Sequence, residues 1–190
     1  DFDEDGQLRE RRNYIDGELN GLWEYFDDNG RLVRGNYIDG GFNGLWERFY
    51  DNGQLENRRN YIDGELNGLR EDFDEDGQLR ERRNYIDGEE DGLFEAFYNN
   101  GQLSQKGNLK NGVFGPAEDG LWEFFYENGQ LSQRGNFIDG EEDGLWENFD
   151  ENGQLNGTGT YRFGVLVEPP RSNEELTRAE EELTRLEEEM

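Results

Sequence analysis

The feature that most constrains this chain is an internal repeat with a period of about 24 residues. A glycine that follows Asn or Asp and precedes Gln-Leu or Arg-Leu marks each copy, and other glycines keep the same step. One interval is longer, about 28 residues, because of an insertion near Val113–Ala117. The marker glycines are Gly6, Gly30, Gly53, Gly77, Gly101, Gly129 and Gly153. The chain is therefore built from about seven copies of one small unit.

Each unit has two short runs of aromatic and β-branched residues around an Asn-Gly or Asp-Gly pair. That pair is the strongest short-range hairpin signal, because a type I′ turn needs positive φ at both central positions. The junction Ile-Asp-Gly-Glu between units is expected to be a looser turn, and Gly115-Pro116 an enlarged loop. Glycine recurs too densely for helix over residues 1–168. The sequence predicts an all-β repeat fold, an elongated and twisted antiparallel meander of about seven 24-residue β-hairpins.

The strand register can be predicted from one hairpin. If Asn128-Gly129 is a two-residue loop, Glu123 faces Arg134 and Trp122 faces Gly135. We expect the ring to cover that glycine, and the charge pair to add ~0.2–1 kcal/mol. The second hairpin is one residue shorter after its glycine and is expected to use a three-residue loop. The same pairing recurs as Glu24 with Arg34, Glu47 with Arg58, Glu71 with Arg82, Glu95 with Lys106, and Glu147 with Thr158.

The C-terminal segment departs from the repeat. Pro169-Pro170 is expected to end a last strand, and Ser172 with Glu175 forms the capping-box pattern of a helix start. A heptad stripe follows, made of Leu176, Ala179, Leu183, Leu186 and Met190. We expect a C-terminal capping α-helix over the last hairpin, with a short coiled coil as the alternative. The predicted organisation is a repeat array over 1–168, then a Pro-Pro linker and amphipathic helix over 169–190.

Composition narrows the functional classes. The chain has 47 acidic and 19 basic residues, a formal charge of −28, with no Cys and no His. Disulfides, thiolate metal sites and the commonest general base are thus absent. We expect no enzyme activity, no cofactor and no small-molecule ligand. The acidity argues against direct binding to nucleic acid or anionic membranes. No signal peptide or apolar run of spanning length is visible, and since the chain opens inside a repeat, its localisation stays open.

Aromatic residues recur at fixed places and are the predicted binding residues. Strand alternation puts them on one sheet face, where they either pack on glycines or offer a ligand surface. They are Trp23, Tyr37, Trp46, Tyr61, Tyr85, Phe94, Trp122, Phe137, Trp146 and Tyr161. Asp72, Asp74 and Asp76 match the start of a calcium loop, but Arg83 stands where a bidentate acid belongs. Solvated turn carboxylates are the preferred interpretation there.

The units G-L-W-E-x-F-x-x-N-G-Q-L and G-N-Y-I-D-G, over about residues 1–168, resemble MORN repeats. The resemblance is to a bacterial variant often found in proteins called antitoxins. It implies antiparallel hairpins and a role in scaffolding, protein binding or membrane association, with no catalytic residues. This sequence departs from the pattern at Arg70, which replaces a Trp, and at Arg59 and Arg83, which replace glycine. Residues 1–17 and 72–88 are identical, which fits recent duplication or a consensus-like engineered array. The acidity could instead reflect a halophilic or marine source.

The functional expectation is a non-enzymatic scaffold for protein binding or self-association through the aromatic face. Two alternatives stay open. A regular acidic row could mimic a phosphate backbone and inhibit a nucleic-acid-binding protein. The aromatic column could belong to a carbohydrate or cell-wall binding module.

Overall fold

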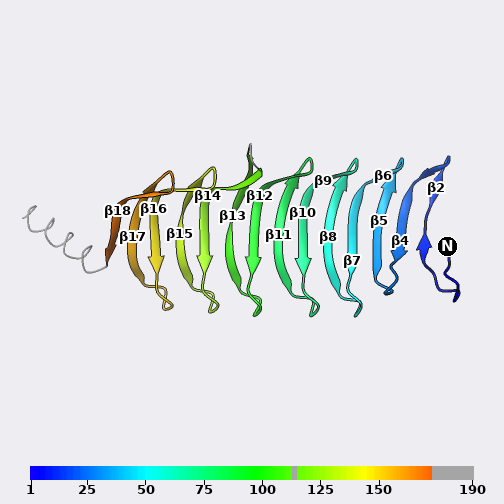
Figure 1. Ribbon diagram of the computed structural model, residues 1–190, viewed down its shortest axis with the longest axis horizontal. Coiled ribbons are helices and arrows are strands. Elements are labelled where there is room, and N and C mark those ends of the chain that lie inside the picture. The colour runs from blue at the N-terminus through cyan, green and yellow to red at the C-terminus, as the bar shows by residue number, and fades with distance from the viewer. Residues whose placement is uncertain (113–114, 173–190) are drawn as a thin grey trace, which may run out of the picture. The chain divides into compact units, whose positions relative to one another are not determined.

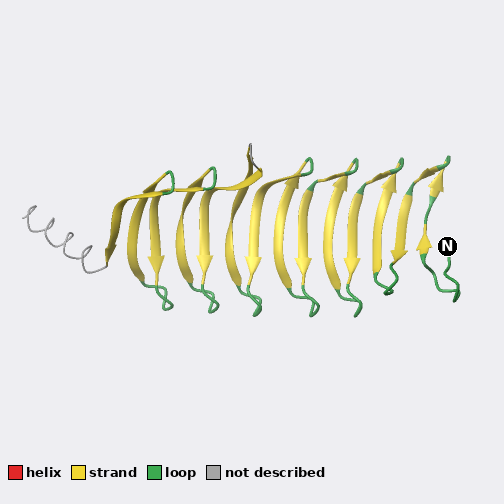
Figure 2. Ribbon diagram, viewed as in Figure 1, coloured by secondary structure: helices red, strands yellow, loops and turns green. Residues whose placement is uncertain are grey.

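The computed structural model of the chain describes residues 1–112 and 115–172. All regular secondary structure in these ranges is β-strand (Figure 2). The chain divides into two compact units, Asp1–Gly101 and Gln102–Met190, and each is described by itself below. No helix in the described part is long and apolar enough to cross a membrane.

Unit 1 is an antiparallel meander in which the strands of the main sheet follow one another in chain order (Figure 1). The main sheet has the order β1-β4-β5-β7-β8-β10-β11-β12, while β6 pairs with β5, β9 with β8, and β2 with β3. The strands are β1 (Glu10–Arg11), β2 (Tyr14–Ile15), β3 (Glu18–Leu19), β4 (Gly21–Phe26), β5 (Leu32–Ile38), β6 (Gly41–Phe42), β7 (Gly44–Phe49), β8 (Leu55–Ile62), β9 (Glu65–Leu66), β10 (Gly68–Phe73), β11 (Leu79–Ile86) and β12 (Glu89–Phe97).

Unit 2 repeats the same topology with longer strands, in the order β13-β14-β15-β16-β17-β18. They are β13 (Leu103–Gly112), β14 (Gly115–Phe125), β15 (Leu131–Ile138), β16 (Glu141–Phe149), β17 (Leu155–Arg162) and β18 (Val165–Ser172). The predicted antiparallel meander is thus confirmed within each unit. The insertion is strand rather than an enlarged loop, because Gly115–Ala117 pair with Lys110–Gly112. Val113 lies outside the described residues.

The two kinds of turn are the reverse of the prediction. At Asn128-Gly129 the Tyr126 N–H donates to the Gln130 carbonyl (2.8 Å), and the Gly129 N–H donates to the Tyr126 carbonyl (2.9 Å). This leaves a three-residue loop in which Gly129 has φ of 82° and Asn128 is not left-handed. It is a type I turn completed by a left-handed glycine.

The junctions between consecutive hairpins form the tight two-residue turns. Asp63 (φ 51°) and Gly64 (φ 88°) both have positive φ, and Ile62 pairs directly with Glu65. This is the type I′ geometry, which Asp and Gly tolerate. The type I′ turns lie along the upper edge of each unit in Figure 1, and the three-residue turns along the lower edge.

The predicted register nevertheless holds, because a bulge offsets the longer loop. Trp122 pairs with Gly135 and Glu123 with Arg134, but the register shifts between Phe124 and Phe125. The extra loop residue and the bulge cancel beyond that point. The second hairpin, β4–β5, has the predicted three-residue loop and no register shift. The residue that this hairpin lacks is the one that forms the bulge in the β14–β15 hairpin.

The C-terminal part of the predicted fold class is wrong. The described residues contain no α-helix, and the last strand, β18, runs on to Ser172 in pairing with β17. Pro169-Pro170 do not end that strand. They fall between the pairs Thr160–Glu168 and Thr158–Arg171, at a register shift, so neither proline has to donate to the ladder. Residues 173–190, which carry the predicted heptad stripe, lie outside the described residues.

Candidate functional site

The ten predicted aromatic residues line one face of each unit, and most pack against one another. Tyr85, Phe94, Trp122 and Trp146 are buried, while the other six are partly exposed. In unit 2 the Trp146 ring lies edge-on to Phe137 at 5.0 Å between centroids, within the range for favourable aromatic pairs. In unit 1 the Phe42 ring packs among these aromatic residues, with its centroid 4.5 Å from that of Tyr37. Ligand binding by this column stays a prediction.

The glycine beneath Trp46, Trp122 and Trp146 belongs to the preceding hairpin, not to the same one as predicted. A Cβ built on Gly135 would lie 2.1 Å from Trp146, and one on Gly107 2.2 Å from Trp122. Trp122 pairs with Gly135 along the backbone, but its ring reaches back over Gly107. In each of these contacts, the tryptophan ring of one hairpin packs on the glycine backbone of the hairpin before it.

The sequence departures at Arg59, Arg70 and Arg83 lie at this contact. Where Arg59 replaces the glycine, the following hairpin has Arg70 in place of a tryptophan. Where Arg83 replaces it, the following ring is the smaller Phe94, and the Arg83 guanidinium lies 5.1 Å from its centroid. Arg83 also pairs with Glu81 (2.6 Å) and Glu90 (2.7 Å), which raises the pKa of the guanidinium. At Arg59 and Arg83 the loss of glycine is thus matched by the loss of tryptophan in the next hairpin, whereas Arg12 occupies the corresponding place before Trp23.

The charged ladder on the opposite face is also displaced by one hairpin. Register pairs such as Glu47–Arg58 and Glu123–Arg134 are confirmed. The ion pairs, however, join each base to the acid of the next hairpin: Arg34 to Glu47 (2.5 Å), Lys106 to Glu123 (2.6 Å) and Arg134 to Glu147 (2.5 Å), with Arg58–Glu71 and Arg82–Glu95 alike.

Four of the five ladder bases, Arg34, Arg58, Lys106 and Arg134, also cover a phenylalanine of the next hairpin. The Arg34 guanidinium lies 5.0 Å from the Phe49 centroid, and that of Arg134 lies 5.6 Å from Phe149. These are cation–π distances. The carboxylates are more enclosed than their bases, with 12% of the Glu47 side chain exposed against 44% for Arg34. The charges of the ladder are therefore neutralised within the protein by its own ion pairs.

Two aliphatic rows on the ladder face remain exposed, and sequence reasoning missed them. In unit 1 three leucines that precede a Trp position are 42–51% exposed, and three isoleucines that precede a type I′ turn are 47–49% exposed. We call these residues the aliphatic face: Leu22, Ile38, Leu45, Ile62, Leu69 and Ile86. Leu121, Ile138 and Leu145 occupy the same places in unit 2. The signal was the strict recurrence of an aliphatic residue opposite the Trp face.

The aliphatic face is hollowed between hairpins and has an acidic border. A hollow of about 340 Å³ lies between Leu22 and Leu45, with Asn36 in its lining. On the side of the type I′ turns, Ile62 is followed by the exposed turn residue Asp63 and pairs across the turn with the exposed Glu65. Apolar rows flanked by carboxylates can take a partner that is both apolar and cationic.

Two of the three calcium candidates, Asp72 and Asp74, are engaged within the protein. Asp72 pairs with Arg70 (2.8 Å). Asp74 accepts the backbone N–H of Gln78 (2.8 Å), and this bond lowers the pKa of its carboxyl. Among the described residues no group of three or more acidic side chains is placed to hold a metal ion.

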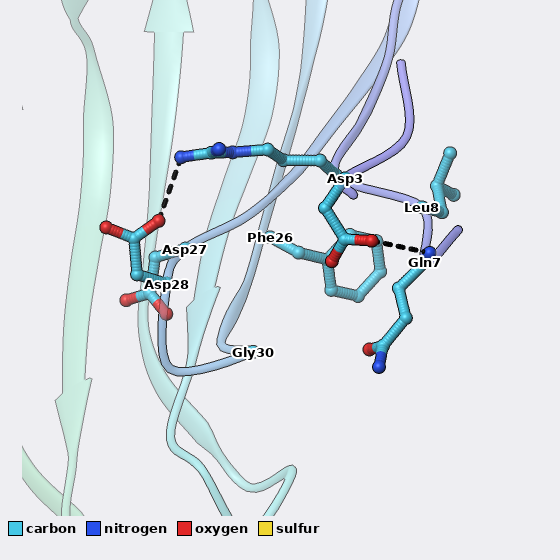
Figure 3. Close-up of a pocket in the computed structure, with 8 residues that line it drawn as sticks. Asp3, Gln7, Leu8, Phe26, Asp27, Asp28 and Gly30 are labelled. Atoms are coloured by element: carbon cyan, nitrogen blue, oxygen red, sulfur yellow. Dashed lines mark hydrogen bonds and ion pairs between the residues drawn. The ribbon is translucent and has the colours of Figure 1, made fainter. Parts of the chain in front are cut away.

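A further hollow, of about 520 Å³, lies between the first two three-residue turns (Figure 3). Its carboxylates already have partners: Asp28 pairs with Arg9 (2.8 Å), and Asp3 accepts the Gln7 N–H (2.7 Å). Asp27 accepts the Arg31 N–H (3.0 Å), which lowers the pKa of its carboxyl. This hollow is a gap between polar turns rather than a ligand site.

The hairpin repeat, its pitch and its aromatic column define a class of β-repeat module. The MORN repeat variant family matches residues 42–63, 66–87, 90–111, 118–139 and 142–162, which together cover more than half of the chain. The chain belongs to this family. The predicted resemblance is thereby confirmed, whereas no finding supports an antitoxin role. A search of curated proteins found no match. The family is generally a non-catalytic repeat module that mediates interactions with proteins or membrane phospholipids.

Proposed function

We propose that this protein is a scaffold that binds a protein partner through the aliphatic face. The observation that carries the proposal is the exposure of aliphatic side chains in rows, one leucine and one isoleucine per hairpin. Contiguous apolar exposure, rimmed by charged residues, is typical of protein interaction sites.

The opposite face supports the proposal by contrast. Trp122 and Trp146 are 3% and 1% exposed and already fill the space over glycines of the preceding hairpin. A partner on that face would meet rings that are buried or only partly exposed, whereas Leu45 and Ile62 are 51% and 48% exposed. We therefore place the partner on the aliphatic face rather than on the aromatic face that the sequence favoured.

The test compares two double variants of equal charge. L45E/I62E adds two carboxylates to the aliphatic face, and Q54E/Q78E adds two at exposed positions near the three-residue turns of the same unit. Both should keep the wild-type circular dichroism spectrum, since all four residues are exposed. We expect L45E/I62E to lose the proteins of the source cell that the wild type and the control retain.

Equal retention by all three proteins would refute the placement. Retention confined to nucleic-acid-binding enzymes, unaffected by either variant but lost in high salt, would instead support the phosphate-mimic alternative. Binding to glycans, lost on truncation of Trp23 or Trp46, would support the carbohydrate alternative.

A further inference from the structure

We propose that the aliphatic face of unit 1 binds an extended cationic peptide segment that runs across the strands, with an apolar residue at every third position. This inference rests on the proposed function and specifies its partner. The argument has three steps: the spacing of the rows, the charges beside them, and the width of the apolar band.

The spacing follows from the sheet topology. The isoleucines Ile38, Ile62 and Ile86 lie on β5, β8 and β11, and consecutive members are two strands apart. Neighbouring strands are about 4.8 Å apart, so the rows repeat every ~9.6 Å. Three residues of an extended polyproline II chain span ~9.3 Å. Seven residues of an α-helix span ~10.5 Å.

The difference between the two conformations accumulates along the row. Over two intervals an extended chain drifts by only ~0.6 Å from the isoleucine spacing, whereas a helix drifts by ~1.8 Å. An extended chain can therefore place one apolar side chain beside each hairpin without stretching. The leucine row, on β4, β7 and β10, has the same two-strand spacing.

Charge selects a cationic chain. Beside the isoleucines lie exposed acids of the type I′ turns, namely Asp39, Asp63 and Glu65, and none of these three forms an ion pair within the described residues of unit 1. The bases nearest on the same face, Arg34 and Arg58, are each held by a glutamate of the next hairpin. The turn side of the band is thus anionic, and the ladder side is neutral.

The width of the band selects a single chain rather than a lipid surface. Only two aliphatic side chains per hairpin lie between the charged ladder and the acidic turns. Leu45 pairs with Asn60, and Ile62 follows two residues later on the same strand face. A strip two side chains wide can be covered by one peptide, while an anionic bilayer would be repelled by its acidic border.

The experiment uses two fluorescein-labelled peptides of identical composition apart from inserted serines. The first is (Leu-Pro-Lys)6, with leucine at every third position, and the second is (Leu-Pro-Lys-Ser)6, with leucine at every fourth. Proline favours the extended conformation in both. Fluorescence anisotropy with the full chain should show at least tenfold tighter binding of the first peptide. The variant I38T/I62T should weaken that binding at least tenfold, while Q54E/Q78E should not weaken it.

Salt dependence provides the second readout. Binding of (Leu-Pro-Lys)6 should weaken as salt rises, and the slope should become shallower in D63N/E65Q. Equal affinity for the two spacings, or tighter binding of an amphipathic heptad helix of the same charge, would overturn the inference. If L45E/I62E loses cellular partners while both extended peptides bind equally poorly, the proposed function stands and this inference falls.

Discussion

The contact between Trp146 and Gly135 gives the sharpest test of how neighbouring hairpins are held together. Trp146 is 1% exposed, and its Cδ2 lies 2.1 Å from the position that a Cβ on Gly135 would take. Gly135 is not in the left-handed region, so alanine is compatible with its backbone. The substitution G135A therefore probes ring packing alone.

The magnitude follows from opposing effects. Alanine for glycine at a compatible position stabilises by about 0.4–1 kcal/mol through the unfolded state. Carbon atoms need about 3.5 Å of separation, so the Trp146 ring must move by more than ~1 Å in a close-packed site. Overpacking of this kind costs about 1–3 kcal/mol and occasionally more. We expect G135A to destabilise the β15–β16 region by about 2 kcal/mol.

The assay is native-state hydrogen exchange on β15 and β16, because stability in repeat proteins is partly local. G159A is the matched control, since the nearest atom to its Cβ would be the flexible Leu166 Cδ1 at 3.2 Å. Adding W146L to G135A should cost clearly less than the sum of the two single changes, with a coupling of about 1 kcal/mol. Equal protection in G135A and G159A, or strict additivity in the double variant, would refute the packing argument.

Three further outcomes are expected. Glu123 pairs with Lys106, and Arg134 pairs with Glu147. The double variant E123R/R134E therefore places like charges at both ion pairs and should have a lower Tm than either single variant. A Tm that recovers toward the wild-type value would contradict this pairing. Asp150 accepts the Gln154 N–H (2.9 Å), which lowers the pKa of the Asp150 carboxyl. The contribution of this carboxylate to stability is present above the unfolded pKa near 3.8 and is lost as pH falls below it. D150A should therefore lower Tm at pH 6 but not at pH 2, and an equal difference in Tm at both pH values would exclude this role. Finally, salt screens the repulsion among the acidic side chains, so Tm should rise between low salt and roughly 1 M salt, and a flat or falling Tm would show that the ion ladder dominates.

The sequence predicted the hairpin fold because its signals are local. Glycine spacing, strand alternation and acid–base positions each depend on residues within one unit, and the register of Glu123 with Arg134 was correct. The turn types were exchanged because Asn-Gly and Asp-Gly occur at both ends of each hairpin. Loop length, which no dipeptide encodes, decides between them. At the C-terminus, Pro169-Pro170 indicated the end of a strand, but a bulge accommodates both.

The candidate site was harder to predict because the decisive contacts join different hairpins. A central residue of a meander has cross-strand neighbours on both sides, and periodicity cannot say toward which side its side chain turns. Arg34 faces Glu24 along the hairpin yet bonds to Glu47. Exposure was hidden for the same reason, since nothing in one unit distinguishes a leucine that a neighbour covers from one that stays open.

This one-hairpin displacement appears on both faces and explains why the aliphatic face stays open. Trp146 completes the surface of the preceding hairpin on one side, and Arg134 covers Phe149 of the following hairpin on the other. Each hairpin thus uses its largest side chains in contacts with the neighbouring hairpins. The leucine and isoleucine rows, represented by Leu45 and Ile62, take part in neither arrangement and are about half exposed. A repeat that stabilises itself through rings and charges can therefore leave its aliphatic residues for a partner, and their constant pitch makes spacing the property by which that partner is selected.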